Sequence, residues 1–374
     1  QDLNAFDVTH NGGHGMVLNS SDLVNLSASS ISNHPGNTNL VITGAAAGSQ
    51  IRGNVIEANN TVVAEDHEIV VSVIPNLVQE ITDNNGLFAT DRGFRIRAGT
   101  LSIDATWRAA DFEYVVEPNA DITVAPDSEL TLEPGLIIKF HAERSWRPDS
   151  DFTIQGELNA EGQPAAPVFF TSLLDDTRGG DTNGDGVNSE AAPGDWGQLR
   201  FTGDSDGDLT HVWFLYGGGG NDGRCCNERT AGDAMLKVAA ERAPTLDSVR
   251  ALYSQSRGAL LNVTGGVGWS LNNGHFESNN GSGVEINGER APISLINNGF
   301  RSNGQDGASV STTGEQTMTG NFSEDNGRHG LVISTSDRLS LNANLVDDHP
   351  SGTGLIISNA SPDSVIDDNE ISDA

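Results

Sequence analysis

The feature that most constrains the fold is a short repeat in the C-terminal part of the chain, with a period of about 24 residues. Each segment has an apolar residue, a polar turn rich in Asn, Asp and Gly, and then a Gly that leads into alternating apolar residues. The aligned glycines recur at nearly equal intervals: Gly258, Gly283, Gly307, Gly330 and Gly354. A fixed period of this length indicates a solenoid in which each repeat is one structural unit.

Each repeat predicts short strands and no helix. Apolar residues alternate with polar ones, as at Val284 and Ile286 or at Leu331 and Ile333. Alternation with a period of two is typical of strands that bury one face. Stacked repeats would satisfy the backbone hydrogen bonds of each strand at about 4.8 Å per coil. We therefore predict an all-β fold, a parallel β-helix with coils of about 24 residues and longer inserted loops.

A second, longer repeat relates the two ends of the chain and is named here the long repeat. Adding 315 to each number places positions 11–56 on 326–371 without a gap, and 19 of these 46 pairs are identical. We expect residues 1–59 to be coils homologous to 316–374, residues 60–106 to be an irregular β segment or loop insertion, and 107–374 to be the main β-helix. About thirteen coils of the short repeat would fill this period, which predicts a rod of about 60 Å per period.

Two interpretations of the long repeat remain open. The chain is either part of a tandem protein or a subunit that stacks end to end, and its start at Gln1 agrees with a processed chain or an excerpt. The recurring pairs His14/His329 and His34/His349 follow from the repeat, so we interpret these histidines as structural turn residues.

The middle of the chain resembles a known family. Residues 130–140 read LTLEPGLIIKF, residues 152–162 read FTIQGELNAEG, and Gly194-Asp195-Trp196-Gly197 follows. This stretch resembles extracellular bacterial right-handed parallel β-helix proteins, which share the fold of pectate lyases and of many surface adhesins. The resemblance implies right-handed coils and an extracellular or cell-surface location. It does not select a function, because one fold hosts many activities.

The strongest local motif is D-x-N-x-D-G, formed by Asp181, Asn183, Asp185 and Gly186. Its spacing matches the first half of an EF-hand loop, where oxygens at positions 1, 3 and 5 and the carbonyl at position 7 bind calcium. Position 12 is Ala192 instead of Glu. Closing carboxylates must therefore come from elsewhere in 175–195, where Glu190 is a further acid. The predicted structural calcium ligands are Asp175, Asp176, Asp181, Asn183, Asp185, Val187 and Asp195. An acidic loop without metal and a catalytic calcium are the alternatives.

The two cysteines, Cys225 and Cys226, are adjacent in the sequence. Neighbouring cysteines seldom bridge each other, because the ring they would close is strained. They are interpreted either as a free or partly buried pair, or as a disulfide or crosslink. The chain has no further Cys to complete a zinc site with this pair.

Charge narrows the range of partners. The chain has 52 acidic and 20 basic residues and a net charge of -32. Nucleic acid and anionic membranes would be repelled from any large face of such a protein. No apolar run approaches the roughly 20 residues that cross a bilayer, so we expect no membrane insertion.

Our first functional interpretation is a non-enzymatic extracellular protein. Exposed strand edges would pair with another copy of the chain, head to tail, and form a calcium-stabilised filament, stalk or adhesive fibre.

The alternative is a polysaccharide-binding or polysaccharide-degrading β-helix of the lyase type. A lyase needs a base such as Arg beside the carboxylates, and Arg178 and Arg200 are near the loop in sequence. A groove lined by Trp, with a basic residue next to calcium, would favour this alternative. The tryptophans either pack at corners or offer sugar-stacking surfaces: Trp107, Trp146, Trp196, Trp213 and Trp269.

Overall fold

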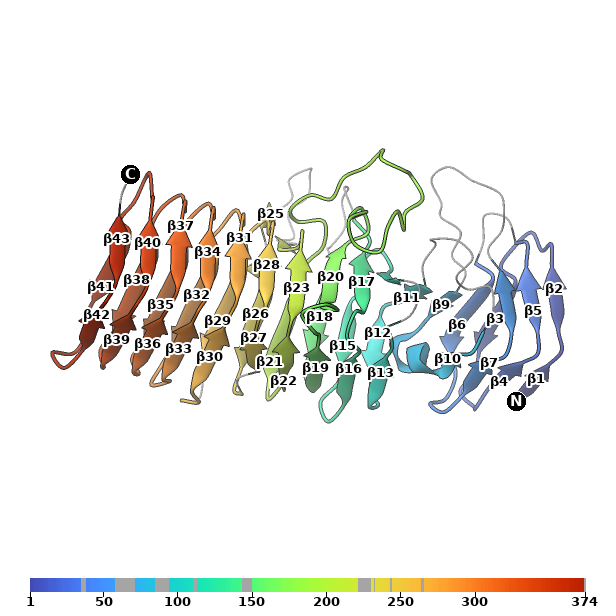
Figure 1. Cartoon of the computed structure of the whole chain (residues 1–374). Coiled ribbons are helices and arrows are strands. Elements are labelled where there is room, and N and C mark those ends of the chain that lie inside the picture. The colour runs from blue at the N-terminus through green and yellow to red at the C-terminus, as the bar shows by residue number, and fades with distance from the viewer. Residues whose placement is uncertain are drawn as a thin grey trace.

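Successive strands wind around one long axis, and the two termini lie at opposite ends of a rod (Figure 1). The computed structural model describes residues 1–34, 38–57, 71–84, 94–109, 113–142, 150–220, 230–231, 233–242, 244–263 and 266–372. Each coil of the main part contributes one strand to each of three parallel sheets, named here sheets 1, 2 and 3.

Sheet 1 runs along the whole rod, and its fourteen strands are, in hydrogen-bonded order, β3 (Met16–Asn19), β6 (Leu40–Gly44), β9 (Val71–Val73), β11 (Phe94–Ile96), β14 (Tyr114–Val116), β17 (Ile137–Phe140), β20 (Val168–Ser172), β23 (Val212–Leu215), β28 (Arg250–Leu252), β31 (His275–Glu277), β34 (Gly299–Arg301), β37 (Phe322–Glu324), β40 (Leu345–Asp347) and β43 (Glu370–Ser372).

Sheets 2 and 3 have ten strands each. Sheet 2 contains β12 (Gly99–Leu101), β15 (Ile122–Val124), β18 (Phe152–Ile154), β21 (Leu199–Gly203), β26 (Ala234–Ala240), β29 (Arg257–Val263), β32 (Val284–Gly288), β35 (Ala308–Thr312), β38 (Leu331–Thr335) and β41 (Leu355–Ser358). Sheet 3 contains β13 (Ala105–Trp107), β16 (Glu129–Leu132), β19 (Glu157–Glu161), β22 (Asp206–Thr210), β27 (Thr245–Asp247), β30 (Trp269–Asn272), β33 (Ile293–Ile296), β36 (Gln316–Thr319), β39 (Leu339–Asn342) and β42 (Val365–Asp367).

The N-terminal coils complete the rod with two smaller parallel sheets. Sheet 4 contains β1 (Asp2–Asn4), β4 (Asn25–Ser27), β7 (Gln50–Arg52) and β10 (Ile81–Thr82), and sheet 5 contains β2 (Asp7–Thr9), β5 (Ser30–Ser32) and β8 (Val55–Glu57). The 3-10 helix η1 (Pro75–Glu80) precedes β10, and an antiparallel pair, β24 (Gly219–Gly220) and β25 (Thr230–Ala231), lies outside the coils. The predicted parallel β-helix is confirmed.

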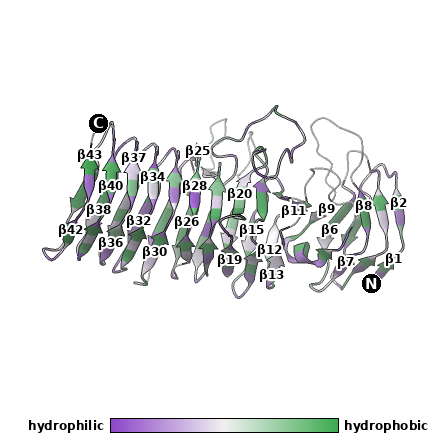
Figure 2. Ribbon diagram, viewed as in Figure 1, coloured by the Kyte–Doolittle hydropathy of each residue, from purple (hydrophilic) through white to green (hydrophobic). Residues whose placement is uncertain are grey.

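The apolar residues of the repeats point into the rod and stack on their counterparts in the next coil. Phe276 lies on Phe300 with ring centroids 5.9 Å apart, and both side chains are fully buried. Hydrophobic and hydrophilic residues alternate along the strands in Figure 2. This continuous column of apolar contacts is the core, and its burial stabilises each coil only through its neighbours.

The repeat glycines mark places where successive coils come close together. A methyl group at Gly283 would lie 2.6 Å from the carbonyl oxygen of Gly307, and one at Gly307 would lie 2.6 Å from that of Gly330. Real side-chain carbons do not approach an oxygen this closely. The repeat therefore requires Gly for its lack of a side chain.

Buried asparagines join the coils at the corner between sheets 3 and 1. Asn298 donates its backbone and side-chain N–H groups to Oδ1 of Asn321, at 3.0 and 2.9 Å. Asn321 donates in the same way to Asn344, and Asn344 to Asn369. This Asn298 ladder satisfies polar groups that water does not reach.

The two ends of the chain fold alike. In the alignment of the long repeat, the strands β1 to β8 fall on β36 to β43, one for one. Side-chain hydrogen bonds recur as well: His34 Nδ1 accepts from the Asn11 backbone, and His349 Nδ1 accepts from that of Asn326.

The estimate of thirteen coils per period is too high. In the long repeat, β3 corresponds to β38. Eleven coil steps along sheet 1 lead from β3 to β37, and β38 is the next strand, on the next side of the same coil. The difference arises because coils in the middle of the chain carry longer connections, such as residues 173–198. Within 60–106, the described residues form β9, η1, β10, β11, β12 and β13, which continue the rod.

Candidate functional site

The connection between β20 and β21, residues 173–198, rises from the rod and covers part of the outer face of sheet 1 (Figure 1). Two predicted calcium ligands close its base. Asp195 Oδ2 accepts hydrogen bonds from Ser172 Oγ and from the Ala192 N–H, both at 2.8 Å. Asp175 accepts from Thr171 Oγ1 at 2.7 Å and from Thr177. These carboxylates thus fix the loop to the strand from which it leaves.

A buried lysine lies beneath the loop. Lys139 points outward from β17, is fully covered, and donates from Nζ to the carbonyl oxygens of Asp175 at 3.1 Å and Gly180 at 2.8 Å. Burial lowers the pKa of this ammonium, while the negative charges of Glu113 and Asp175 oppose that shift. The lysine therefore holds the loop against sheet 1 and partly balances the acids above it.

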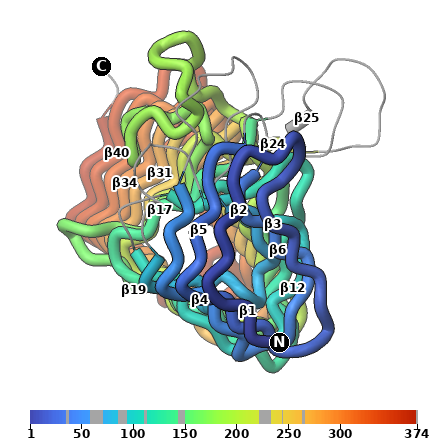
Figure 3. The backbone as a smooth tube through the Cα atoms, turned by 90° about the vertical axis from the view of Figure 1, so that its right-hand side faces the viewer, coloured from blue at the N-terminus to red at the C-terminus, as the bar shows by residue number. Residues whose placement is uncertain are grey.

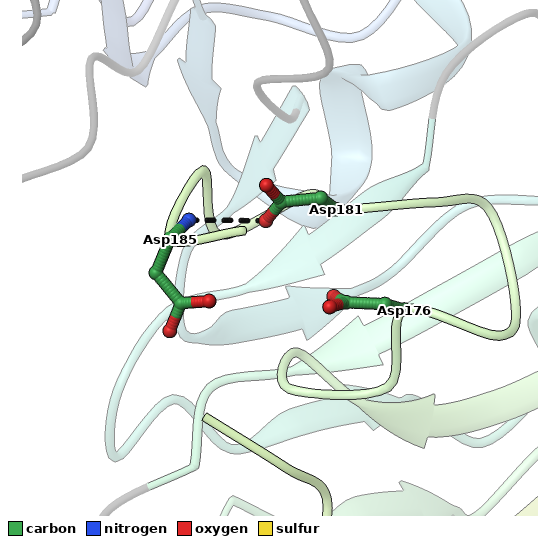
Figure 4. A group of neighbouring side chains, drawn as sticks. All are labelled: Asp176, Asp181 and Asp185. Carbon is green, nitrogen blue, oxygen red and sulfur yellow. Dashed lines mark hydrogen bonds between the residues drawn. The ribbon is translucent and has the colours of Figure 1, made fainter. Parts of the chain in front are cut away.

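Three loop carboxylates converge: one oxygen from each of Asp176, Asp181 and Asp185 lies within 4.8 Å of the others (Figure 4). Asp181 accepts from the backbone N–H of Asp185 at 3.1 Å and of Gly186 at 2.8 Å, as the tight D-x-N-x-D-G turn requires. Among the described residues, Oδ1 of Asp176 and Oδ1 of Asp185 are buried without a hydrogen-bond partner. Burial, followed by repulsion from Asp181, raises the pKa of Asp176.

Three of the seven predicted calcium ligands, Asp176, Asp181 and Asp185, belong to this converging group. Asn183 is buried, donates to Ser189 Oγ at 2.9 Å and faces the Asp185 backbone with its oxygen at 3.5 Å. The Val187 side chain is 92% exposed. Asp175 and Asp195 make the hydrogen bonds described above, outside the group of three. Cys225 and Cys226 lie outside the described residues.

The donor set fits a hard divalent cation. Calcium takes carboxylate and carbonyl oxygens. The three carboxylates converge, and two of them, Asp176 and Asp185, each have an oxygen without a hydrogen-bond partner. Without a cation, three clustered negative charges repel each other.

A row of arginine and aromatic side chains lies on sheet 1 beside this loop. Trp213 on β23 pairs in register with Phe169 on β20 and with Arg250 on β28, and Arg250 pairs with His275 on β31. The Arg250 guanidinium lies 4.2 Å from the Trp213 ring centroid, and Arg178 from the loop lies 5.1 Å from it. Burial, followed by the positive charge of Arg250, lowers the pKa of His275.

Two strained tyrosines flank the row. Tyr216 and Tyr253 follow β23 and β28, have φ of 63° and 62°, and stack with ring centroids 5.1 Å apart. A left-handed backbone is costly for such a bulky residue. The next coils place Ser278, Ser302 and Asp325 at the same corner. Tyr253 is 39% exposed, so the ring pair costs folding energy and remains accessible.

No sequence motif predicted a role for Tyr216, Tyr253, Arg250 or His275. Aligning the coils by the corner position would have set the two tyrosines against serines and aspartates, but loops of unequal length obscure that alignment in the middle of the chain.

Other residues considered from sequence lie elsewhere. Arg200 points out from β21 in sheet 2, where its Nε donates to Thr153 Oγ1 at 2.9 Å. It is therefore on a different sheet from the row that contains Trp213. Trp107, Trp196 and Trp269 are buried in the core, as the packing interpretation predicts. Trp146 lies outside the described residues.

Comparison with known proteins supports the fold. A family model described as a right handed beta helix region matches residues 258–374. The match identifies these C-terminal coils as a right-handed β-helix region, and the parallel sheets continue the β-helix through the rest of the described chain. One similar solved structure is a crystal structure of a double mutant of the periplasmic alginate epimerase AlgG, at 12% identity, with 81% of this chain and 84% of that chain covered and a TM-score of 0.24. No curated protein matches this β-helix protein. Among its described residues, no helix is long and apolar enough to cross a membrane.

Proposed function

We propose that this β-helix protein binds a polysaccharide outside the cytoplasm or at the cell surface. The proposed binding surface, named here the loop face, comprises Arg178, Trp213, Tyr216, Arg250, Tyr253 and His275. The observation that carries the proposal is the row of arginine and aromatic groups beside the Asp176–Asp181–Asp185 group, because a tryptophan with basic residues next to a cation site is the arrangement that favours the polysaccharide interpretation.

The chemistry of the loop face supports an acidic polysaccharide as the ligand class. Aromatic rings offer flat apolar surfaces for the C–H faces of sugar rings. Guanidinium groups bind carboxylates or sulfates through charge-assisted hydrogen bonds. The rest of the molecule is strongly acidic, so a polyanion would be repelled elsewhere and guided to this face.

Calcium is the second part of the proposal. Asp176, Asp181 and Asp185 would hold it, with Asn183 and the Val187 carbonyl as further oxygen donors of the predicted set. Bound calcium supplies positive charge that offsets the loop carboxylates and attracts acidic sugars. We propose binding without bond cleavage, because Arg200 lies on sheet 2, away from the carboxylates, and the Arg178 guanidinium packs on the Phe169 and Trp213 rings.

Two substitutions test the loop face. Tyr253→Ser is expected to weaken binding to a polyuronate about tenfold, the effect of removing an interface aromatic worth somewhat more than 1 kcal/mol. The same change is expected to leave folding intact or improve it, since Ser278 occupies this corner in the next coil. Arg250→Ala is expected to weaken binding similarly. Titration calorimetry with calcium present measures both.

Arg338→Ala is the matched control, because it removes an exposed arginine from the corner between sheets 2 and 3. Unchanged affinity in Tyr253→Ser and Arg250→Ala would contradict the proposed surface. Preference for a neutral glucan over a polyuronate would contradict the ligand class, and release of unsaturated sugar products would replace binding by lyase activity.

A second candidate function, a structural fibre built by end-to-end association, is supported by the terminal coils. Within the described residues, β41, β42 and β43 pair on one side only, and Val365, Ile366 and Ile371 are 46%, 55% and 52% exposed. The first coils of the chain are equivalent to these last coils in the long repeat. Each end therefore offers strand edges that the other end of a second copy would cover.

Sedimentation velocity tests this association. We expect the sedimentation coefficient to rise with concentration in calcium, and Ile366→Asp with Ile371→Asp to abolish the rise. Val267→Asp, which changes an apolar residue of similar exposure away from the ends, should leave it in place. A concentration-independent coefficient in the unaltered chain would exclude association of separate subunits.

A further inference from the structure

The two equivalent ends of the chain lie on different sides of the rod. In the alignment of the long repeat, the strands β3 and β6 correspond to β38 and β41. However, β38 and β41 belong to sheet 2, whereas β3 and β6 belong to sheet 1. Figure 3 views the rod from its N-terminal end, with these first strands in blue in front of the later coils.

The change of side is made by continuous strand pairing. Sheet 1 joins β6 to β9, β9 to β11, and β11 to β14 through parallel pairs. The inward column remains apolar throughout: Leu40, Val71, Phe94 and Tyr114 pair in register and are all buried. A parallel ladder requires only an extended neighbour, whichever side of the coil that neighbour comes from.

One period of the long repeat therefore contains eleven coils and one further side of a three-sided coil. At about 4.8 Å per coil, this amounts to a rise of about 54 Å. The extra side also determines the rotation between successive copies. A whole number of coils would bring each sheet back to its starting side, whereas eleven coils and one further side place it on the next side of the rod.

We infer that successive copies of this β-helix, in one polypeptide or as subunits stacked end to end, are turned by a third of a turn relative to each other. This turn adds to the twist that the coils accumulate by themselves. The inference rests on the end-to-end candidate function. It places the loop face of each copy on a different side of the column, so that three copies present it all around.

The functional consequence is multivalent contact in every direction. A column that carried its binding face on one side would bind polysaccharide chains along one line. A column with the face on three sides would link several chains and gain avidity without new contacts. A second copy of this chain is thus the partner that each terminal coil fits, in one rotational register.

A covalent two-copy protein tests the rotation independently of spontaneous association. Residues 1–315 are followed directly by residues 1–374, so that the N-terminal coils of the second copy take the place of 316–374 in the first. A short epitope is inserted after Glu289, an exposed residue at the corner between sheets 2 and 3. Bound antibody fragments are then located by electron cryomicroscopy.

We expect one straight rod that carries two antibody fragments about 54 Å apart along its axis. The angle between the two fragments about that axis should exceed the accumulated twist of the coils by a third of a turn. Fragments related by coil twist alone would overturn the inference, and so would two rods joined by a hinge. Absence of self-association in the single chain, or of polysaccharide binding, would leave this measurement unaffected and would reject only the corresponding proposed function.

A second variant addresses folding of the junction. Phe6 falls on Asn321 and Ser29 falls on Asn344 in the long repeat, so the junction lacks two of the four asparagines of the Asn298 ladder. Phe6→Asn in the second copy restores the acceptor for Asn298. It is expected to raise the melting temperature of the two-copy protein without changing the rotation, and a changed rotation in this variant would also overturn the inference.

Discussion

Replacing Asn321 by alanine is expected to lower the free energy of unfolding by about 4 kcal/mol, because each buried polar group left unsatisfied costs about 1–3 kcal/mol. Asn321 is buried in the ladder, where Oδ1 accepts two hydrogen bonds from Asn298 and Nδ2 donates to the Leu295 carbonyl and to Asn344 Oδ1, both at 2.9 Å. Alanine removes all four bonds and leaves buried donors and acceptors without partners.

The measurement is equilibrium unfolding in denaturant, followed by circular dichroism. Asn280→Ala is the control, because Asn280 is an exposed residue of a neighbouring corner and should change stability by less than about 0.5 kcal/mol. An effect of similar size at both positions would mean that the ladder hydrogen bonds do not contribute to stability beyond an ordinary surface asparagine.

Removal of calcium is expected to lower the melting temperature by several degrees. A ligand that binds only the folded state stabilises it by about 2.7 kcal/mol at a free concentration 100 times its dissociation constant. In this protein the binding energy would come from offsetting repulsion among Asp176, Asp181 and Asp185, whose oxygens converge. Chelation restores that repulsion and loosens the loop that Lys139 and Asp195 hold on sheet 1.

The double variant Asp181→Asn with Asp185→Asn should melt at one temperature with and without chelator. The control Asp204→Asn with Asp325→Asn removes the same number of charges from exposed positions and should keep the difference. If chelation shifts neither the unaltered protein nor the control, the carboxylate group is an acidic loop without metal. If it shifts the double variant as much as the control, calcium binds elsewhere.

Part of the candidate site could be predicted from the sequence, and part could not. Asp181 and Asp185 were found because a metal loop is a local motif with fixed spacing. Arg250 and His275 were missed because their row is built by register between coils, across a full coil of sequence that carries no motif. Asp175 and Asp195 were grouped with the loop acids by proximity in sequence, yet their carboxylates bond to Thr171, Thr177, Ser172 and Ala192 at its base.

Sequence alone determined the strand, the coil and the equivalence of the two ends, because each of these depends on contacts that recur once in every coil or once in every period of the long repeat. The column of Gly283, Gly307 and Gly330 is visible as a repeat before its cause, the close approach of carbonyl oxygens, is seen.

Only the tertiary structure decided how many coils fit in one period and which side of the rod each copy faces. Backbone pairing accepts any extended neighbour, so the step from β6 through β9 and β11 to β14 leaves no signature in residue type.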